Sequence, residues 1–376
     1  MKIVVAPDSF KGSLTQVEAA HIMEQGIRDV IPNSQVIKKP MADGGEGTLD
    51  ALLTAAPQSE RIPIEVTGPL GDQIQTSIGV INHDTAVIEV AAICGLPLVP
   101  EDQRHPYQTT TYAIDEAIKI ALDRGLRKLI IGLGGSSTND GGFGMLAALG
   151  VNFKDTQGKA VGIFGKELFH IHSIDLSQLD VRLKGTRMFI ASDVDNTLCG
   201  NKGATYVFGP QKGVKDTQLQ PLDQAMKRYS HLLEAAFKPE KSYVNQAGAG
   251  AAGGLGFALL HLGAEIQSGA KLVADHMGLK DAIIKADLVL TGEGKSDAQT
   301  LYGKAPGYVA KLANLYQVPV ILISGIVEDP SQQLASLFSE VYELKEKNVS
   351  LERAMKEANM ILLNKTKTIM RRFYHD

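Results

Sequence analysis

The chain has 376 residues, which at about 150 residues per domain is enough for two domains or for one elaborate α/β unit. Hydrophobic residues make up 44% and charged residues 21% of the sequence, and this composition excludes an intrinsically disordered protein. The net charge is −4 and no basic stripe is visible, so a nucleic-acid binder is not expected.

The N-terminal 65 residues alternate between strand and helix patterns. Residues 2–6 and 35–38 are predicted strands, and an apolar helical pattern follows each of them. Thr15 and Glu18 predict a capping box at the start of the first helix. The apolar stripe of that helix consists of Val17, Met23, Ile27 and Val30. This β-α-β-α order is typical of the start of a parallel sheet.

The pattern then changes to closely spaced strands, which we interpret as a β-meander and the start of a second domain. The predicted strands of the meander cover residues 61–66, 74–81 and 86–91. Two further buried strands are predicted over 128–131 and 188–191. Helices are predicted over 110–124, 142–149, 217–237 and 251–262.

From about residue 270 the alternation of strand and helix returns. Strands are predicted over 286–290, 318–323 and 339–344, and helices over 304–316 and 350–372. We therefore predict an α/β fold in which a parallel, Rossmann-like sheet domain is interrupted by an inserted mixed α/β domain. The first domain would comprise residues 1–66 plus 266–376 and the inserted domain residues 67–265, with the active site in the cleft between them.

Cysteine usage and hydropathy bear on the compartment. Cys94 and Cys199 are far apart and alone, so no disulfide framework is expected. The sequence holds neither a CxxC nor an HExxH motif, which disfavours a dedicated zinc site. The N-terminal apolar run ends at Pro7, too early for a signal peptide, and no run approaches the ~18 residues that a membrane span needs. We expect a cytoplasmic protein without a membrane partner.

Glycine-rich segments repeatedly follow apolar runs or precede helices. Glycine lets the backbone approach a ligand closely and direct several N–H groups at it, which suits phosphate or carboxylate groups. The segments are 43–48 (DGGEGT), 132–137 (GLGGSS), 248–256 (GAGAAGGLG) and 291–296 (TGEGKS). A single such loop is equally consistent with an ordinary turn, but four together favour an anion site.

The standard nucleotide motifs are incomplete. Gly294, Lys295 and Ser296 match the end of a Walker A motif, but Val289 occupies the place of its first glycine. Residues 248–253 match GxGxxG, yet no convincing strand precedes them. Their small side chains could equally allow a helix to pack closely against its neighbour.

Acidic residues mark two strand ends. Asp193 and Asp195 follow a buried strand, and together they could share Mg²⁺ or divide the roles of metal ligand and base. Their segment is also similar to the first motif of haloacid-dehalogenase-type phosphatases, D-x-D-x-T, in which Asp193 would be a nucleophile; a solvated turn is the third alternative. Asp8 and Lys11 lie in the first strand-end loop, where they form either a functional pair or a salt bridge.

Several strings together resemble the type-1 glycerate kinases, in family order from residue 3 to about residue 325. They are 8–13 (DSFKGS), 42–48 (ADGGEGT), 134–142 (GGSSTNDGG), 192–196 (SDVDN), 198–200 (LCG), 207–213 (VFGPQKG), 248–254 (GAGAAGG), 291–294 (TGEG), Asp297, 299–300 (QT) and 303–306 (GKAP). Two positions depart from the family pattern. Thr197 stands where proline is expected, and Lys295-Ser296 where Arg-Ile is expected.

The resemblance implies a kinase that phosphorylates D-glycerate with ATP and Mg²⁺, mainly to 2-phosphoglycerate. Asp193 and Asp195 are then expected to hold Mg²⁺ and to orient or deprotonate the glycerate hydroxyl, while Lys11 and Lys295 neutralise the transferring group. The residues expected to bind ATP phosphates or the glycerate carboxylate are Gly134, Gly135, Ser136, Ser137, Gly292, Glu293 and Gly294. The expected substrate contacts are Asp8, Asp43, Glu46 and Lys212.

Two alternatives stay open on the residues alone. One is the phosphatase with an Asp193 phosphoenzyme, for which we find no later acidic pair to hold Mg²⁺. The other is a non-catalytic sensor of nucleotides or small acids. The expected partners are small molecules, D-glycerate and ATP, and a homo-oligomer is compatible with the sequence.

Overall fold

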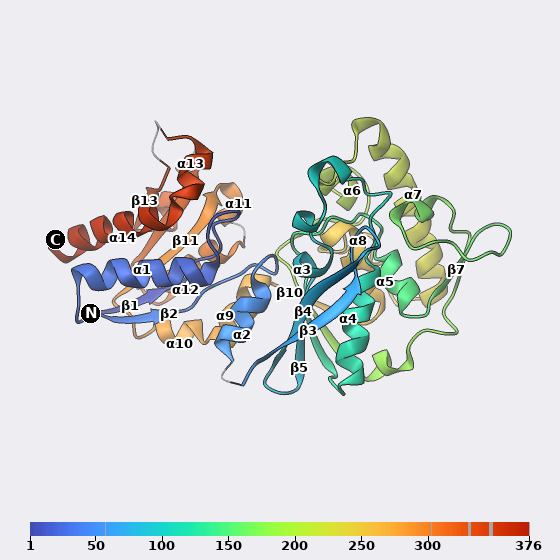
Figure 1. The fold of residues 1–376 in the computed structure, drawn as a ribbon, viewed down its shortest axis with the longest axis horizontal. Helices are drawn as coiled ribbons and strands as arrows, with labels where there is room; N and C mark the ends of the chain where they lie inside the picture. Colours follow the sequence, from blue (N-terminus) through green and yellow to red (C-terminus); the bar gives the residue numbers. More distant parts are fainter. Residues whose placement is uncertain (57, 302, 330–331, 346–348, 376) are drawn as a thin grey trace. The chain divides into compact units, whose positions relative to one another are not determined.

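The computed structural model describes residues 1–56, 58–301, 303–329, 332–345 and 349–375 (Figure 1). The chain divides into two compact units. Unit 1 consists of Met1–Asp43, Asp50–Pro57 and Ser268–Asp376, and unit 2 of Gly44–Leu49 and Gln58–Gln267. Both contain sheets with parallel strands, so the fold is of the α/β class.

Unit 1 is built on a five-stranded sheet in which every neighbouring pair is parallel. Its order is β13 (Glu340–Glu343), β12 (Val320–Val327), β11 (Leu288–Ser296), β1 (Lys2–Val5) and β2 (Gln35–Lys38). Ile3 of the central strand β1 pairs with Leu288 on one side and with Val36 on the other. Because the chain runs from β1 outward to β2 and later from β11 outward to β13, the strand order reverses between β1 and β11.

Helices cover the sheet of unit 1 on both faces (Figure 1). α1 (Gln16–Val30) and α14 (Ala358–His375) pack side by side, and their apolar residues share a core with alternate residues of the strands, such as Val5, Leu290 and Ile323. The intervening strand residues point to the other face, where α12 (Ala305–Leu315) packs on β11 and β12. α9 (Gly269–Met277) and α10 (Leu279–Ile283) lie beside α12.

The capping box predicted for α1 is confirmed. The backbone N–H of Glu18 donates to Thr15 Oγ1 at 3.2 Å, and the backbone N–H of Thr15 donates to Glu18 Oε2 at 2.9 Å. These bonds satisfy N–H groups that the first helical turn leaves without partners. They also fix Thr15 as the residue at which the loop after β1 ends and α1 begins.

Unit 2 is built on a six-stranded mixed sheet. Its order is β10 (Glu265–Gln267), β9 (Arg187–Ala191), β6 (Lys128–Gly132), β5 (Thr85–Glu89), β4 (Gln73–Ile81) and β3 (Glu60–Thr67). The first four strands are parallel, whereas β5, β4 and β3 form the expected antiparallel meander. A separate hairpin pairs β7 (Asn152–Lys154) with β8 (Ser173–Asp175).

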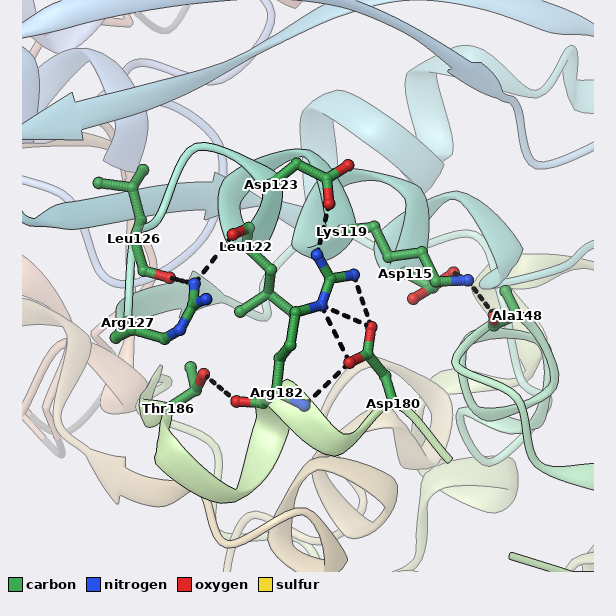
Figure 2. Close-up of polar contacts among 10 residues, drawn as sticks. All are labelled: Asp115, Lys119, Leu122, Asp123, Leu126, Arg127, Ala148, Asp180, Arg182 and Thr186. Atoms are coloured by element: carbon green, nitrogen blue, oxygen red, sulfur yellow. Dashed lines mark hydrogen bonds and ion pairs between the residues drawn. The ribbon is translucent and has the colours of Figure 1, made fainter. Parts of the chain in front are cut away.

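Helices of unit 2 bury one large apolar core with this sheet. They are α3 (Val90–Cys94), α4 (Tyr112–Asp123), α5 (Phe143–Ala148), α6 (Ala204–Phe208), α7 (Asp216–Phe237) and α8 (Ala251–His261). Polar contacts hold the C-terminal end of α4 (Figure 2). The Arg182 guanidinium pairs with Asp180 at 2.6 Å and also with Asp123, the last residue of α4.

The observed boundary between the units differs from the predicted one at residue 66/67. β3 belongs to unit 2, because Glu60–Thr67 pairs along its whole length with β4, and the segment Gly44–Leu49 belongs there as well. The prediction of one continuous helix over 350–372 is wrong. The segment forms two helices, α13 (Leu351–Lys356) and α14, since Glu357 leaves the helical conformation with φ −99° and ψ 12°.

Candidate functional site

Unit 1 contains a pocket of about 390 Å³ at the carboxyl ends of its parallel strands. The loop that follows β1 and the C-terminal residues 293–295 of β11 both line it, and these are the two strands between which the strand order reverses. In open parallel sheets such a reversal leaves a crevice, because the helices that follow the two strands cover opposite faces. The pocket therefore lies where an α/β sheet of this topology binds a ligand.

The pocket has a polar side and an apolar side. The polar lining residues are Asp8, Ser9, Lys11, Ser13, Asp43, Glu293, Lys295, Lys304 and Lys345. The apolar lining comes from Phe10, Ile326, Leu344, Leu351, Ala354, Met355, Ala358 and Ile361, together with the glycines Gly294 and Gly325. Six of the predicted residues, Asp8, Lys11, Asp43, Glu293, Gly294 and Lys295, thus come together here from distant parts of the sequence.

The buried carboxyl of Asp8 has a perturbed pKa in this pocket. Its burial, followed by the negative charges of Asp43 and Glu293, raises the pKa of Asp8 well above the usual value. The backbone N–H of Ser9, which donates to Asp8 Oδ1 at 2.6 Å, and the Lys11 ammonium act in the opposite direction. A carboxyl group with a raised pKa inside a pocket is a candidate for proton transfer.

Glu293 is held by hydroxyl groups of its own segment. Ser296 Oγ donates to Glu293 Oε1 at 2.9 Å and Thr300 Oγ1 donates to the same oxygen at 2.7 Å. Burial still raises the pKa of Glu293, because these bonds and the Lys304 ammonium offset it only in part. Lys304 Nζ lies 3.9 Å from Glu293 Oε2 and 3.6 Å from Asp297 Oδ1.

Gly292 and Lys295, both on β11, have different environments. Gly292 does not line the pocket; a Cβ there would lie 2.3 Å from the Ile323 carbonyl oxygen, so glycine serves the close pairing of β11 and β12. Lys295 does line the pocket, but its side chain is 51% exposed and Nζ pairs with Glu328 Oε2 at 2.8 Å. Lys295 is therefore at the solvent side of the pocket.

In unit 2 the predicted loops also gather at the carboxyl ends of parallel strands. Residues 133–138 follow β6 and residues 192–197 follow β9, and these two strands are neighbours in the sheet. The segment Gly44–Leu49 crosses the same edge, where the N–H of Gly134 donates to the Gly44 carbonyl at 2.9 Å. A Cβ at Gly134 would lie 2.3 Å from Gly45 Cα, so only glycine permits this contact between the backbones.

Glu89, at the end of β5, fixes that segment, although the sequence analysis did not select it. Its carboxylate accepts hydrogen bonds from the backbone N–H of Leu49 at 2.8 Å and of Gly47 at 3.2 Å. Leu49 belongs to the first turn of α2 (Thr48–Ala55), so Glu89 satisfies a helix N-terminus from a neighbouring element. Glu46 lies in the same segment and its side chain is exposed.

Lys212 is almost fully buried, with 3% of its surface exposed. Its ammonium group donates to Ser136 Oγ at 2.9 Å and to the Thr138 carbonyl at 2.7 Å. Burial lowers the pKa of Lys212 to about 8, while nearby Cys94 and Asp140 act to raise it. Lys212 therefore holds the glycine-rich loop after β6 from inside.

The rest of that loop is fixed by further buried bonds. Ser137 donates both its N–H and its Oγ–H to the Cys94 carbonyl, each at 2.9 Å. Asp140 accepts from the N–H and the hydroxyl of Thr111 and from the N–H groups of Gly142 and Gly144. The loop is thus rigid before any ligand binds, which lowers the entropic cost of binding.

Asp193 is partly buried and Asp195 is exposed, both just after β9. The backbone of their segment is anchored, since the N–H of Ser192 donates to the Gln267 carbonyl and the N–H of Gly250 to the Asn196 carbonyl. Among the residues that the structure describes, no group of three or more His, Cys, Asp or Glu side chains could by itself hold a metal ion. Two carboxylates do suit Mg²⁺, which proteins commonly bind through one or two carboxylates plus substrate phosphates.

The GxGxxG string of residues 248–253 serves packing. It precedes and enters α8, and no strand lies between α7 and α8 in this fully described stretch, so the geometry of a dinucleotide fingerprint is absent there. Ala252, Gly253 and Gly254 adopt the left-handed conformation. A Cβ at Gly253 would lie 2.1 Å from the Thr138 carbonyl oxygen, so the small residues allow contact with the loop after β6.

Sequence reasoning missed most of the apolar side of the unit 1 pocket. Leu351, Ala354 and Met355 come from a helix whose apolar pattern signals only that it is amphipathic. Lys304 and Ser9 stood in recognised strings but received no role, and Lys345 carried no signal. Their approach to β1 and β11 depends on the sheet order.

Parallel sheets whose carboxyl ends carry carboxylates, lysines and rigid glycine-rich loops define a class of enzyme that binds small anionic substrates. Residues 3–374 match the glycerate kinase family. The chain therefore belongs to the glycerate kinase family, and it is an enzyme of that kind, a transferase.

Individual relatives agree with this assignment. The chain is 46% identical to a glycerate kinase of Haemophilus influenzae over 331 residues, which cover 88% of this chain and 87% of the relative. It is 44% identical to a glycerate 2-kinase of Escherichia coli over 331 residues, 88% of this chain and 86% of the relative. A crystal structure of a protein from Salmonella typhimurium LT2, assigned as glycerate kinase 2, superposes with a TM-score of 0.84 at 40% identity and covers 100% of this chain and 98% of that one.

These findings do not favour the phosphatase or the non-catalytic sensor considered above. An enzyme of this family binds small-molecule substrates. In the described part of the chain no helix is both long enough and apolar enough to cross a membrane.

Proposed function

We propose that the protein transfers the γ-phosphoryl group of ATP to the 2-hydroxyl of D-glycerate, forming 2-phosphoglycerate and ADP. The observation that carries the proposal is the match to glycerate kinases along the whole chain, which includes a relative named glycerate 2-kinase. The unit 1 pocket and the unit 2 loops described above support it, because they carry groups suited to this chemistry. Phosphoryl transfer depends mainly on positioning and on neutralising charge, with little covalent work for the protein.

In unit 1, the proposal assigns charge neutralisation to lysines of the pocket, Lys11 and Lys304 foremost, with Lys295 at its solvent side. Each presents an ammonium group to a ligand whose phosphates carry several negative charges. Asp8 is a candidate for accepting the hydroxyl proton, because a carboxylate with a raised pKa holds a proton more firmly than an ordinary one. Burial of the carboxyl, together with the negative charges of Asp43 and Glu293, keeps that pKa raised.

In unit 2, the proposal assigns the rigid loop of residues 134–138 to binding an anionic group through backbone N–H groups. Lys212 keeps the loop in place from the interior. Asp193 and Asp195 are the proposed carboxylates for Mg²⁺. When bound, Mg²⁺ would neutralise charge that develops on phosphate oxygens.

The test measures ADP release from MgATP by the full-length protein with and without D-glycerate. Release that requires D-glycerate supports the kinase, and release of inorganic phosphate from phosphoesters without ATP would contradict it. The position of phosphorylation follows from coupling the product to enolase, which acts on 2-phosphoglycerate and leaves 3-phosphoglycerate unchanged until a mutase is added. A signal that needs the mutase would move the assignment to the 3-hydroxyl.

A further inference from the structure

The apolar side of the unit 1 pocket leaves a large hydrophobic side chain exposed to solvent. Leu351 lines the pocket and is 50% exposed, and Ala354 and Met355, from the same helix α13, are partly exposed. Leu344 and Ile361 continue this apolar lining. Covering such side chains with an apolar ligand surface is favourable, in proportion to the area removed from water.

One part of the pocket wall has no side chains. Gly294 and Gly325 lie on the paired strands β11 and β12, and a Cβ on Gly325 would lie 2.4 Å from the Gly294 carbonyl oxygen. The wall here is therefore backbone alone. A ligand can approach the backbone of these two glycines without meeting a side chain at their positions.

The polar side of the same pocket offers donors. Lys11, Lys304 and Lys345 line it. Ser9 lines it as well, and its buried Oγ, in a residue only 8% exposed, has no hydrogen-bond partner in the described structure. A buried hydroxyl without a partner costs free energy, which a ligand with a polar group at this position would recover.

We propose that this pocket binds the purine base and ribose of the phosphoryl donor, with the base against the apolar side formed by Leu351, Ala354 and Met355 and the backbone of Gly294 and Gly325, and with the phosphates toward the lysines. The inference rests on the proposed function and names the subsite of one of its two substrates. A volume of about 390 Å³ is in the range of pockets that enclose a nucleotide-sized ligand.

The alternative occupant, D-glycerate, does not explain the apolar side. Each of its three carbon atoms carries oxygen, so it has no apolar surface to place against Leu351 and Met355. A purine nucleoside has both the planar apolar base and the polar ribose. The mixed lining of the pocket matches the second ligand and not the first.

The experiment is calorimetric titration of the full-length protein, separately with MgADP and with D-glycerate. Ala354→Tyr fills the apolar side, and we expect it to raise the Kd for MgADP by about tenfold or more while the Kd for D-glycerate stays within about twofold. Lys356→Tyr places the same side chain elsewhere on α13, where Lys356 is exposed and does not line the pocket. This control should bind both ligands as the wild type does.

Leu351→Ala is the second variant, because removing a half-exposed side chain leaves the fold intact. We expect it to raise the Kd for MgADP by about threefold. Unchanged MgADP affinity in a folded Ala354→Tyr protein, or in Leu351→Ala should Ala354→Tyr unfold, would overturn the inference. An effect on D-glycerate in place of MgADP would overturn it too and would assign the pocket to the acid.

Binding and turnover separate this inference from the proposed function. Calorimetry does not depend on catalysis, so weakened MgADP binding in the pocket variants supports the subsite even if the wild type fails to phosphorylate D-glycerate. The converse outcome is also distinct. If the wild type forms ADP only with D-glycerate, and the pocket variants bind MgADP as tightly as the wild type does, the proposed function is retained and the subsite is overturned. A wild type that binds no MgADP at all contradicts the inference directly.

Discussion

The ammonium group of Lys212 lies 2.9 Å from Ser136 Oγ, although the two residues are 76 positions apart in the sequence. The bond joins a buried cation to a glycine-rich loop that would otherwise be held mainly by backbone contacts. A buried charge without a carboxylate partner costs stability, and the fold retains it at the loop that follows β6. The ionisation of Lys212 should therefore affect the stability of the fold.

Lys212 should make stability rise with pH in the alkaline range. Burial lowers the pKa of Lys212 from 10.5 to about 8, so between these values the unfolded chain binds a proton that the folded chain does not. The free energy of unfolding of the wild type should therefore rise from about pH 8 to pH 10 relative to that of Lys212→Met, with a slope of at most ~1.4 kcal/mol per pH unit. Denaturant unfolding at several pH values measures this.

Lys227→Met is the control for Lys212, because Lys227 lies on α7 and is exposed. Its unfolding curve should keep the same pH dependence as the wild type. If the free energies of unfolding of the wild type and of Lys212→Met depend on pH in the same way, the Lys212 ammonium is solvated in solution and the prediction is wrong.

Asp115 should make the free energy of unfolding fall as pH rises through the acidic range, opposite to the effect of Lys212 in the alkaline range. Its burial raises the pKa of Asp115 from 3.8 to about 6, although Lys119 pairs with it at 3.0 Å (Figure 2). The folded chain thus holds a proton more firmly than the unfolded chain, and this stabilisation is complete below about pH 3.8 and is lost as pH rises through about 6. Asp115→Asn should gain stability relative to the wild type between pH 4 and pH 7, by roughly 1–3 kcal/mol.

The informative quantity is the pH dependence of that difference, since the asparagine amide also loses an ion pair with Lys119. Asp123→Asn provides the comparison, because Asp123 lies on the same helix with its side chain 66% exposed. Its difference from the wild type should change little over the same range. If Asp115→Asn behaves like Asp123→Asn, the Asp115 carboxylate is ionised at neutral pH without cost.

Asp193 should be essential and should never carry phosphate. In the proposed direct transfer the glycerate oxygen attacks the γ-phosphorus of ATP, so Asp193→Asn and Asp195→Asn are each expected to lower turnover by roughly 10²-fold or more without trapping an intermediate. Acid quench after mixing with γ-labelled ATP, followed by treatment with hydroxylamine, detects an acyl phosphate. A label on Asp193 that forms and decays as fast as turnover would establish a phosphoenzyme mechanism.

Substitutions at Lys295 and at its partner Glu328 test whether the Lys295 ammonium contacts the ligand or only forms an ion pair at the surface. If its ammonium stabilises the transferring group, Lys295→Ala should lower kcat by roughly 10²-fold with little change in melting temperature. Glu328→Gln removes only the partner at 2.8 Å and should leave kcat within about twofold of the wild type. Equal effects of the two variants, or none from either, would make Lys295 part of a solvated ion pair alone.

Local features of this protein could be read from its sequence. The apolar runs and periodic stripes predicted the main strands and helices, and Thr15 with Glu18 predicted the cap of α1, because these patterns act over a few residues. The glycine-rich string after β6 and the Asp193 segment after β9 were correctly expected at strand ends. The type-1 glycerate kinase resemblance identified the family that the comparisons show.

Only the tertiary structure decided what those residues contact. Three features depend on which strands are neighbours. They are the burial of Lys212, the raised pKa of Asp8 and the hydrogen bond from the start of α2 to Glu89. Strand order brings β1 beside β11 and places α13 against the loop after β1, where a Cβ on Gly12 would meet Met355 Cε at 2.7 Å. Burial and charge proximity are set by contacts between residues remote in sequence, and no pattern of a few residues encodes them.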